Sequence, residues 1–247
     1  MQTIPKVIHY VWFGGGKHSK LQKRCMRSWR KFCPDFKIIR WDESNFDLSS
    51  APLYVRQAYE AKKWAFVSDY VRLKALYDHG GIYFDTDAEV LKDISHLLQN
   101  NAFLAFEGSE MVTTGVMGCC KGDAIVGEIL KTYGERKFYN DDGSINTTVT
   151  GIYTTEVFLK HGLVVGGKEQ MVENWKVYPF TYFYPVKVIN DKTYYTEDTC
   201  ICHWFEGTWF PEEYKRAKRH DKNPVIKFLR KTPLMKLYYK LKGNPQK

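Results

Sequence analysis

One stretch in the middle of the chain constrains the fold more than any other. Residues 53–79 have helical spacing, in one helix or two, and the glycine pair at 80–81 is expected to end the helix as a C-terminal cap. The apolar run 82–84 follows at once as a strand, and Asp85 and Asp87 come at its end. In an extended chain these two carboxylates project to the same side, at the strand end where open α/β sheets bind ligands. The alternative is an ordinary acidic turn that closes the strand.

Helices and strands alternate along most of the sequence. Residues 6–13 form a continuous apolar, β-branched and aromatic run, expected as a buried first strand in which His9 is a core histidine. Further strands are expected at 36–41 and 102–106, strands with aromatic loops at 175–185 and 194–205, and further helices at 21–32, 94–98, 123–133 and 153–161. This alternation predicts an α/β domain with a mostly parallel sheet flanked by helices.

The charge of the chain is concentrated at its C-terminal end. Of the net +9, residues 214–247 contribute +11 (twelve Lys and Arg against one acid), and the rest contributes −2 (25 against 27). We therefore expect a catalytic domain at 1–211 and a basic, amphipathic helical tail at 212–247. The tail could be a solvated appendage, a surface that binds anionic lipid, or a nucleic-acid contact. Nucleic acid is disfavoured, because the body is nearly neutral and has no reading motif.

Several features indicate the cell compartment. No run of about 18 apolar residues exists that could span a membrane. The opening MQTIPKV lacks the apolar core of a signal peptide, so we expect a cytoplasmic protein. The six cysteines include no pair of CxxC motifs, and reduced, buried thiols are expected rather than a structural zinc site.

A polar helix face precedes the glycine pair. At about 100° per residue, Ser68, Asp69 and Arg72 lie within about 100° of one another. Alone, they could form a solvated face with an Asp–Arg ion pair. The nearby carboxylates of Asp85 and Asp87 repel each other unless a cation lies between them, so a divalent ion fits there. Mg²⁺ or Mn²⁺ suits such hard oxygen ligands, with substrate phosphates completing the coordination shell.

The segment FVSDYVRLKALYDHGGIYFDTD resembles the signature of the DXD sugar transferases of glycosyltransferase family 32. The opening IPKVIHYVWFGG is similar to that family's first strand. TGIYTT (150–155) and HWFEGTW (203–209) resemble weaker motifs, with Ile152 in place of proline and Thr208 in place of serine. The resemblance spans residues 4–209, and large clostridial glucosylating toxins carry a related arrangement. All fixed positions of the main signature are matched: Ser68, Asp69, Arg72, Leu76, Gly80, Gly81, Tyr83, Asp85 and Asp87.

The resemblance implies a GT-A fold, a nucleotide-diphospho-sugar donor, a divalent metal ion and retention of anomeric configuration. By position, Trp12 would stack on the nucleotide base, and Asp69 and Arg72 would hold the donor sugar and its phosphates. The implied donor-binding residues are Val11, Trp12, Phe13, Ser68, Asp69, Arg72, Tyr83, Asp85 and Trp209, and the implied catalytic residues are Asp85, Asp87 and Arg72.

The implied metal ligands are Asp87, Asp85 and His203. Asp87 would bind the metal directly, and Asp85 would assist while contacting donor hydroxyls. His203 is the candidate for a further metal or diphosphate contact, and Glu206 and Thr208 compete with it. Trp209 would close over the donor.

The sequence therefore predicts a retaining, metal-dependent hexosyltransferase. It would transfer a sugar from a nucleotide-diphospho-sugar, preferably a UDP-sugar, to a lipid-linked glycan acceptor. The product would be a surface polysaccharide such as a capsule. The protein would lie at the inner face of the cell membrane, bound through residues 214–247. Two alternatives stay open: an inactive sugar- or nucleotide-binding protein on the same fold, and a magnesium-dependent nucleotidyltransferase. The latter needs a phosphate-cradling glycine loop, and residues 14–16 match none of the known patterns.

Overall fold

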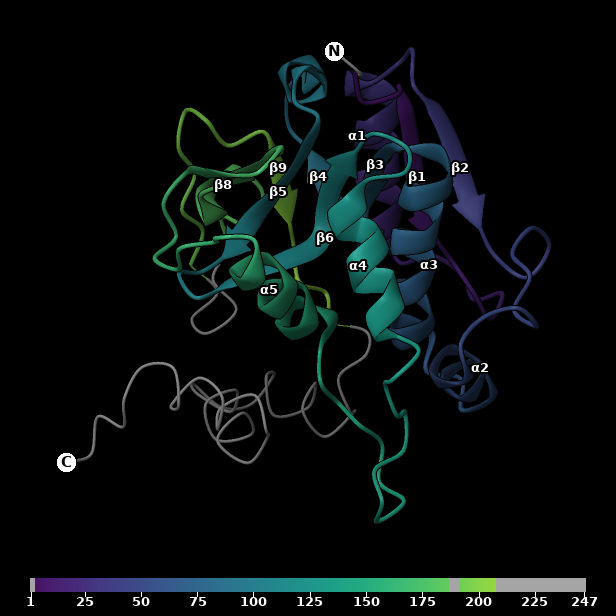
Figure 1. Cartoon of the computed structure of the whole chain (residues 1–247). Coiled ribbons are helices and arrows are strands. Elements are labelled where there is room, and N and C mark those ends of the chain that lie inside the picture. The colour runs from purple at the N-terminus through teal and green to yellow at the C-terminus, as the bar shows by residue number, and fades with distance from the viewer. Residues whose placement is uncertain (1–2, 187–191, 208–247) are drawn as a thin grey trace.

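A computed structural model describes residues 3–186 and 192–207. Helices and strands alternate in it as the sequence predicts (Figure 1). The helices are α1 (Lys20–Phe32), α2 (Leu53–Glu60), α3 (Trp64–His79), α4 (Ala124–Thr132) and α5 (Thr150–Lys160), with short 3₁₀ helices at Ser95–Gln99 and Phe180–Tyr182. The strands are β1 (Val7–Val11), β2 (Lys37–Trp41), β3 (Gly81–Phe84), β4 (Ala88–Val90), β5 (Ala102–Glu107), β6 (Met111–Cys119), β7 (Gln170–Val172), β8 (Trp175–Tyr178) and β9 (Ile201–His203).

The central sheet has seven strands in the order β2-β1-β3-β6-β5-β8-β7. β1 pairs in parallel with β2 and β3, and β5 pairs in parallel with β8. β6 is antiparallel to both β3 and β5, and β7 is antiparallel to β8. Every strand except β6 and β7 therefore runs in one direction. The prediction of a mostly parallel α/β sheet flanked by helices is confirmed.

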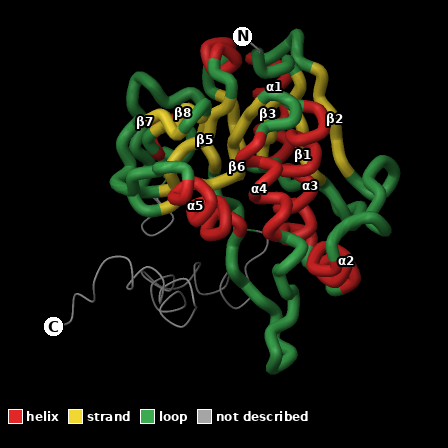
Figure 2. Tube along the Cα trace, viewed as in Figure 1, coloured by secondary structure: helices red, strands yellow, loops and turns green. Residues whose placement is uncertain are grey.

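The helices cover both faces of this sheet, which gives three layers (Figure 2). One face packs against α3, α4 and α5, and its core includes Leu73, Ile125 and Phe158. The other face packs against α1, where Trp29 is fully buried beside Phe84. Burial of such large apolar side chains on both faces is the main contribution to the stability of the fold.

The glycine pair between α3 and β3 is required by backbone geometry. Gly80 and Gly81 have φ angles of 66° and 110°, which residues with a side chain rarely adopt. A Cβ atom at Gly81 would also lie 2.7 Å from the carbonyl oxygen of Val7 in the neighbouring strand. His9 is the predicted core histidine: its Nε2 donates to the Gly80 carbonyl (2.8 Å), and its Nδ1 accepts from the Trp41 indole (3.0 Å). The helix therefore turns into the strand within two residues and delivers the following aspartates at the strand end.

Two parts of the fold differ from the sequence-based expectation. Residues 111–119, for which no strand was predicted, form the nine-residue strand β6 at the centre of the sheet. Residues 194–205, expected as strand and loop, contribute only the short strand β9, which pairs antiparallel with β4 in a separate two-stranded sheet. This small sheet joins the segment after the aspartates to the C-terminal part of the described chain.

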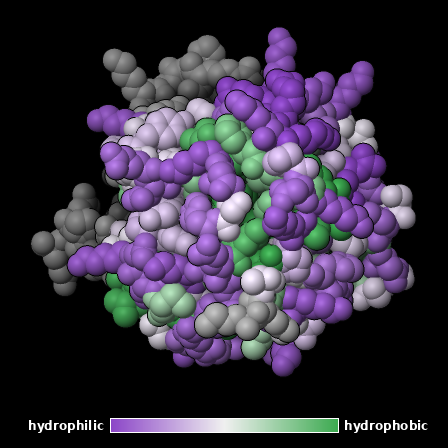
Figure 3. Space-filling view, turned by 90° about the horizontal axis from the view of Figure 1, so that it is seen from above, coloured by the Kyte–Doolittle hydropathy of each residue, from purple (hydrophilic) through white to green (hydrophobic). Residues whose placement is uncertain are grey.

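All six cysteines are free and buried. Among residues 3–186 and 192–207, no helix is both long and apolar enough to cross a bilayer. The face seen from above in Figure 3 is mostly hydrophilic around a smaller hydrophobic area. The tail and the boundary at residue 211 lie outside the described residues, so the division into 1–211 and 212–247 stays a prediction.

Candidate functional site

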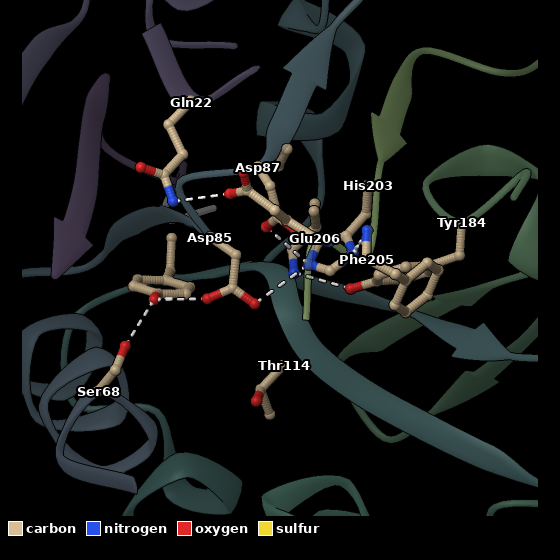
Figure 4. Close-up of polar contacts among 12 residues, drawn as sticks. Gln22, Ser68, Asp85, Asp87, Thr114, Tyr184, His203, Phe205 and Glu206 are labelled. Carbon is tan, nitrogen blue, oxygen red and sulfur yellow. Dashed lines mark hydrogen bonds and ion pairs between the residues drawn. The ribbon is translucent and has the colours of Figure 1, made fainter. Parts of the chain in front are cut away.

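Backbone hydrogen bonds fix the chain that carries the two aspartates. Directly after β3, the Asp85 N–H donates to the carbonyl of Gly115 in β6 (2.8 Å). On the other side, the carbonyl of Asp87 accepts from the N–H of Trp204 (3.1 Å). The aspartates are therefore tied to two segments that are distant in sequence, and both carboxylates point into the space between them (Figure 4).

His203 completes a cluster with these carboxylates. In β9, where it pairs with Ala88, its Nε2 lies 3.2 Å from Asp85 Oδ2 and 3.3 Å from Asp87 Oδ1. One ligand atom from each of the three residues lies within 4.8 Å of the others. The imidazole ring packs against Tyr184, and the His203 side chain is 10% exposed. The structure thus brings together the three residues predicted as metal ligands.

The competing candidates for the third ligand are placed differently. The carboxylate of Glu206 accepts a hydrogen bond from the amide of Gln22 (2.8 Å) and so is directed toward α1. Its backbone N–H donates to Asp87 Oδ2 at 2.7 Å. Thr208 lies outside the described residues. Among the described candidates, His203 therefore faces the carboxylates with a ligand atom, whereas Glu206 orients Asp87 through its backbone.

The cluster fits a divalent cation. Two carboxylates and one imidazole offer the mixed oxygen and nitrogen ligands that Mn²⁺ accepts. Strand β6 passes the cluster at Gly115, where a Cβ atom would lie 2.7 Å from Asp85 Oδ2 and 3.1 Å from His203 Nε2. Burial lowers the pKa of His203, but the carboxylates of Asp87 and Asp85 outweigh it and raise the pKa to about 9. The two carboxylates therefore favour a positive charge at this place.

A buried arginine lies beside the cluster. Arg72 Nη2 lies 2.9 Å from Asp69 Oδ1 and 3.1 Å from Asp85 Oδ1, and its side chain is 7% exposed. Nη1 donates to the hydroxyl of Thr114 in β6 (3.2 Å), and the guanidinium stacks over the ring of Tyr83 at 4.6 Å. Burial would raise the pKa of Asp85, but Arg72 and His203 outweigh burial, so the pKa is lowered. Burial raises the pKa of Asp69 to about 6 in spite of Arg72. Asp85 is thus kept ionised at the centre of the site.

Ser68 and Tyr83 lie behind Asp85. The Tyr83 hydroxyl donates to Asp85 Oδ1 (2.8 Å) and is 3.0 Å from the hydroxyl of Ser68. Tyr83 is 1% exposed, which places its side chain beneath the site rather than on its surface. Both residues are therefore placed to orient the Asp85 carboxylate.

Three predicted donor-binding residues, Val11, Trp12 and Phe13, lie at the end of β1 and directly after it. Val11 and Phe13 are 6% and 4% exposed and pack in the core. Trp12 is partly exposed, its indole N–H donates to the Gly16 carbonyl (2.8 Å), and its ring centroid lies 4.0 Å from that of His18. Of the three side chains, Trp12 is therefore the one that offers a ring surface. Trp209, predicted to close over the donor, lies outside the described residues.

Three residues of the site were not predicted from the sequence. Gly115 and Thr114 come from β6, and the β-branched residues between 112 and 116 were the available signal for a strand there. Gln22, which holds Glu206, also caps α1 by bonding the backbone N–H of Ser19 (3.0 Å). The spacing Ser19-x-x-Gln22 is that of a capping box, and it marked the start of the helix without indicating the second contact.

Comparison with known proteins agrees with this site. Residues 19–104 match the family model described as a glycosyltransferase sugar-binding region containing a DXD motif. An uncharacterised glycosyltransferase of Acanthamoeba polyphaga mimivirus is 26% identical over 241 residues, which covers 92% of this chain and 91% of that protein. An inositol phosphoceramide mannosyltransferase of Schizosaccharomyces pombe is 28% identical over 137 residues, covering 52% of this chain and 37% of that protein. Among solved structures, the PaToxG glycosyltransferase is 18% identical with a TM-score of 0.49, covering 64% of this chain and 69% of that one.

Proposed function

We propose that the chain is a retaining, metal-dependent hexosyltransferase that uses a nucleotide-diphospho-sugar, with a UDP-sugar favoured; the match of residues 19–104 to the sugar-binding region of DXD glycosyltransferases supports this. The observation that carries the proposal is the cluster of Asp85, Asp87 and His203, with ligand atoms within 4.8 Å of one another beside the buried Arg72. Asp87, Asp85 and His203 would hold Mn²⁺ or Mg²⁺. When bound, the cation would neutralise the negative charge that develops on the departing nucleoside diphosphate.

The protein groups around the cluster orient and tune it. Arg72 keeps Asp85 ionised, and Tyr83 and Glu206 hold the two carboxylates in their positions by hydrogen bonds. Trp12 offers the ring on which the base would stack. Retention in glycosidases commonly uses a carboxylate nucleophile, but no residue is assigned that role here. In the proposed mechanism the acceptor attacks on the face that the diphosphate leaves, and the departing phosphate takes the acceptor's proton.

The proposed acceptor is a lipid-linked glycan used to build a surface polysaccharide. The basic composition of residues 214–247 supports a position at the inner face of the cell membrane, because basic side chains bind anionic lipid surfaces. One relative is named an inositol phosphoceramide mannosyltransferase, which is consistent with an acceptor that contains a lipid. Both the acceptor and the location are proposals.

A nucleotidyltransferase is less well supported. Such an enzyme needs a glycine loop whose backbone N–H groups bind phosphate. Here the N–H of Gly14 donates instead to the side chain of Glu43 (2.7 Å). An inactive sugar-binding protein would have no chemical need for the arrangement of Asp69, Arg72 and the metal cluster.

The test is metal-dependent hydrolysis and transfer measured across a panel of UDP- and GDP-sugars. We expect turnover with Mn²⁺ and a loss of at least about 100-fold for Asp87→Ala, because a direct ligand is removed. Asp141→Ala is a matched control, since the side chain of Asp141 is 91% exposed and pairs with Lys137 at the surface. If no nucleotide sugar is bound or turned over, the enzyme proposal fails. If Asp87→Ala keeps full activity, the metal assignment fails.

A further inference from the structure

A second cationic group lies near the site, held between two aromatic rings. The guanidinium carbon of Arg136 is 3.6 Å from the ring centroid of Tyr133 and 3.7 Å from that of Tyr153. Tyr133 directly follows α4, and Tyr153 lies in the first turn of α5. Rings on both faces hold the planar guanidinium in one orientation, and its N–H groups point outward from the edge.

Most hydrogen-bonding capacity of this guanidinium is unused. It has five N–H donors, and Nη2 donates to the hydroxyl of Thr132 (2.7 Å). The Nε atom is buried and has no partner in the described part of the chain. Within residues 3–186 and 192–207, no carboxylate forms an ion pair with Arg136. The Nη1 atom also has no hydrogen-bond partner among the described residues, so the arrangement is suited to a ligand that supplies an acceptor group to this end of the guanidinium.

Arg136 lies at the Asp69 end of the site. Burial raises the pKa of Asp69, and the positive charges of Arg72 and then Arg136 oppose that rise, so Arg136 is close enough to act on this carboxylate. Asp69 pairs with Arg72, and Arg72 with Asp85, so these contacts lead from Arg136 toward the proposed metal cluster. The diphosphate of the donor belongs at the opposite end of this series, at Asp87.

Arg136 is partly exposed. It lies near the start of the segment that joins α4 to α5, and this segment extends away from the rest of the domain in Figure 1. The hydroxyl of Tyr133 is 3.4 Å from that of Thr150, the first residue of α5. Helix α5 begins there with no side-chain cap and no acidic residue in its first turn, so its N-terminus adds positive potential.

We infer that Arg136 binds an anionic group, a phosphate or a carboxylate, on the acceptor. The inference rests on the proposed function for its use in catalysis, but the binding site itself can be tested without turnover. Contact through the Nη atoms suits either group, because the two stacked rings cover the faces of the guanidinium and not the end that carries the Nη atoms. The same chemistry could come from the donor, if its sugar carried a carboxylate, and the experiment separates these two sources.

The experiment measures binding of matched probes by calorimetry or NMR titration. For the acceptor the probes are glucose 6-phosphate and glucose, and for the donor they are UDP-glucuronate and UDP-glucose in the presence of Mn²⁺. We expect the unchanged protein to bind glucose 6-phosphate about tenfold or more tightly than glucose, the usual worth of a charge-assisted hydrogen bond. Arg136→Gln should abolish this preference, and Arg136→Lys should keep part of it. Lys137→Gln is the matched control, because it removes the same charge from the adjacent, exposed residue.

Other outcomes of these titrations would contradict the inference or the proposed function. No preference for the phosphorylated sugar, or the same preference in a folded Arg136→Gln protein, overturns the inference. A loss confined to UDP-glucuronate binding also overturns it, because the anion would then belong to the donor. Absence of donor binding to every variant would contradict the proposed function alone, since binding of glucose 6-phosphate is measured without a donor.

Discussion

Adding one methyl group at Gly115 should weaken metal binding while leaving the fold intact. The Cβ of Gly115→Ala would lie 2.7 Å from Asp85 Oδ2 and 3.1 Å from His203 Nε2. Ordinary van der Waals contact begins at 3.4 Å, so Asp85 Oδ2 would have to move about 0.7 Å away from the new Cβ. Distances to a bound metal ion tolerate only about 0.2 Å. The two ligand atoms could therefore not keep their positions around one cation.

The size of the effect follows from that displacement. Disturbing groups that orient metal ligands costs about 10- to 100-fold in affinity. Because two ligands are affected at once, we expect the Mn²⁺ affinity to fall by about 100-fold, the upper end of this range, which corresponds to about 2.7 kcal/mol of binding free energy. Arg72 and Tyr83 hold Asp85 from the other side, which limits how far the carboxylate can move away.

Calorimetric titration with Mn²⁺ measures this loss directly. Gly134→Ala is the matched control, because the nearest atom to its new Cβ is 3.4 Å away, and its backbone needs no positive φ. The thermal unfolding midpoint of each variant checks that it is folded. If Gly115→Ala and the unchanged protein bind Mn²⁺ with equal affinity, the cation does not lie between Asp85 and His203, and the assignment is refuted.

Three further predictions concern stability and the tail. Burial lowers the pKa of His9 to about 4 against 6.5 in the unfolded chain, so its neutral form stabilises the fold above pH 6.5. About 3 kcal/mol should be lost as the pH falls from 6.5 to 4. His9→Gln should remove this part of the pH dependence in urea unfolding, and an unchanged slope would contradict the assignment. Ser28→Ala should lower the free energy of unfolding by about 1–3 kcal/mol, because Ser28 Oγ accepts from the buried N–H of Val90 (2.9 Å); a loss below about 0.5 kcal/mol would argue against it. Deleting residues 214–247 should reduce sedimentation with anionic liposomes, and unchanged sedimentation would exclude the lipid-binding role of the tail.

The sequence predicted best the parts of the fold that depend on local interactions. The helices around α3 follow from side-chain spacing, and the break between α2 and α3 falls at Lys62, which adopts a positive φ of 54°. Gly80 and Gly81 were recognisable because a sharp turn from helix to strand demands their φ values. Asp85 and Asp87 then follow at a fixed distance along the chain.

The parts that were not predicted depend on partners far away in sequence. β6 contains Gly118, where a Cβ would lie 2.6 Å from the ring of Phe103 in the neighbouring strand, so tertiary packing rather than strand propensity selects glycine. His203 was identified through the resemblance, since nothing local in its segment signals that it meets Asp85. Arg136 was not identified, because its environment is complete only when Tyr153 of another helix stacks on it.

The pairing of β4 with β9 has a consequence for the order of events during synthesis. His203 and Asp85 are separated by 118 residues, so the contact cannot form until most of the chain has left the ribosome. Contacts of such long range also form late in folding, because closing a long loop must precede them. A nascent or truncated chain that already has β3 and both aspartates would thus hold two of the three proposed metal ligands. The capacity to bind the metal with all three ligands would arise only after β9 has docked, which would keep incomplete chains from consuming nucleotide sugar.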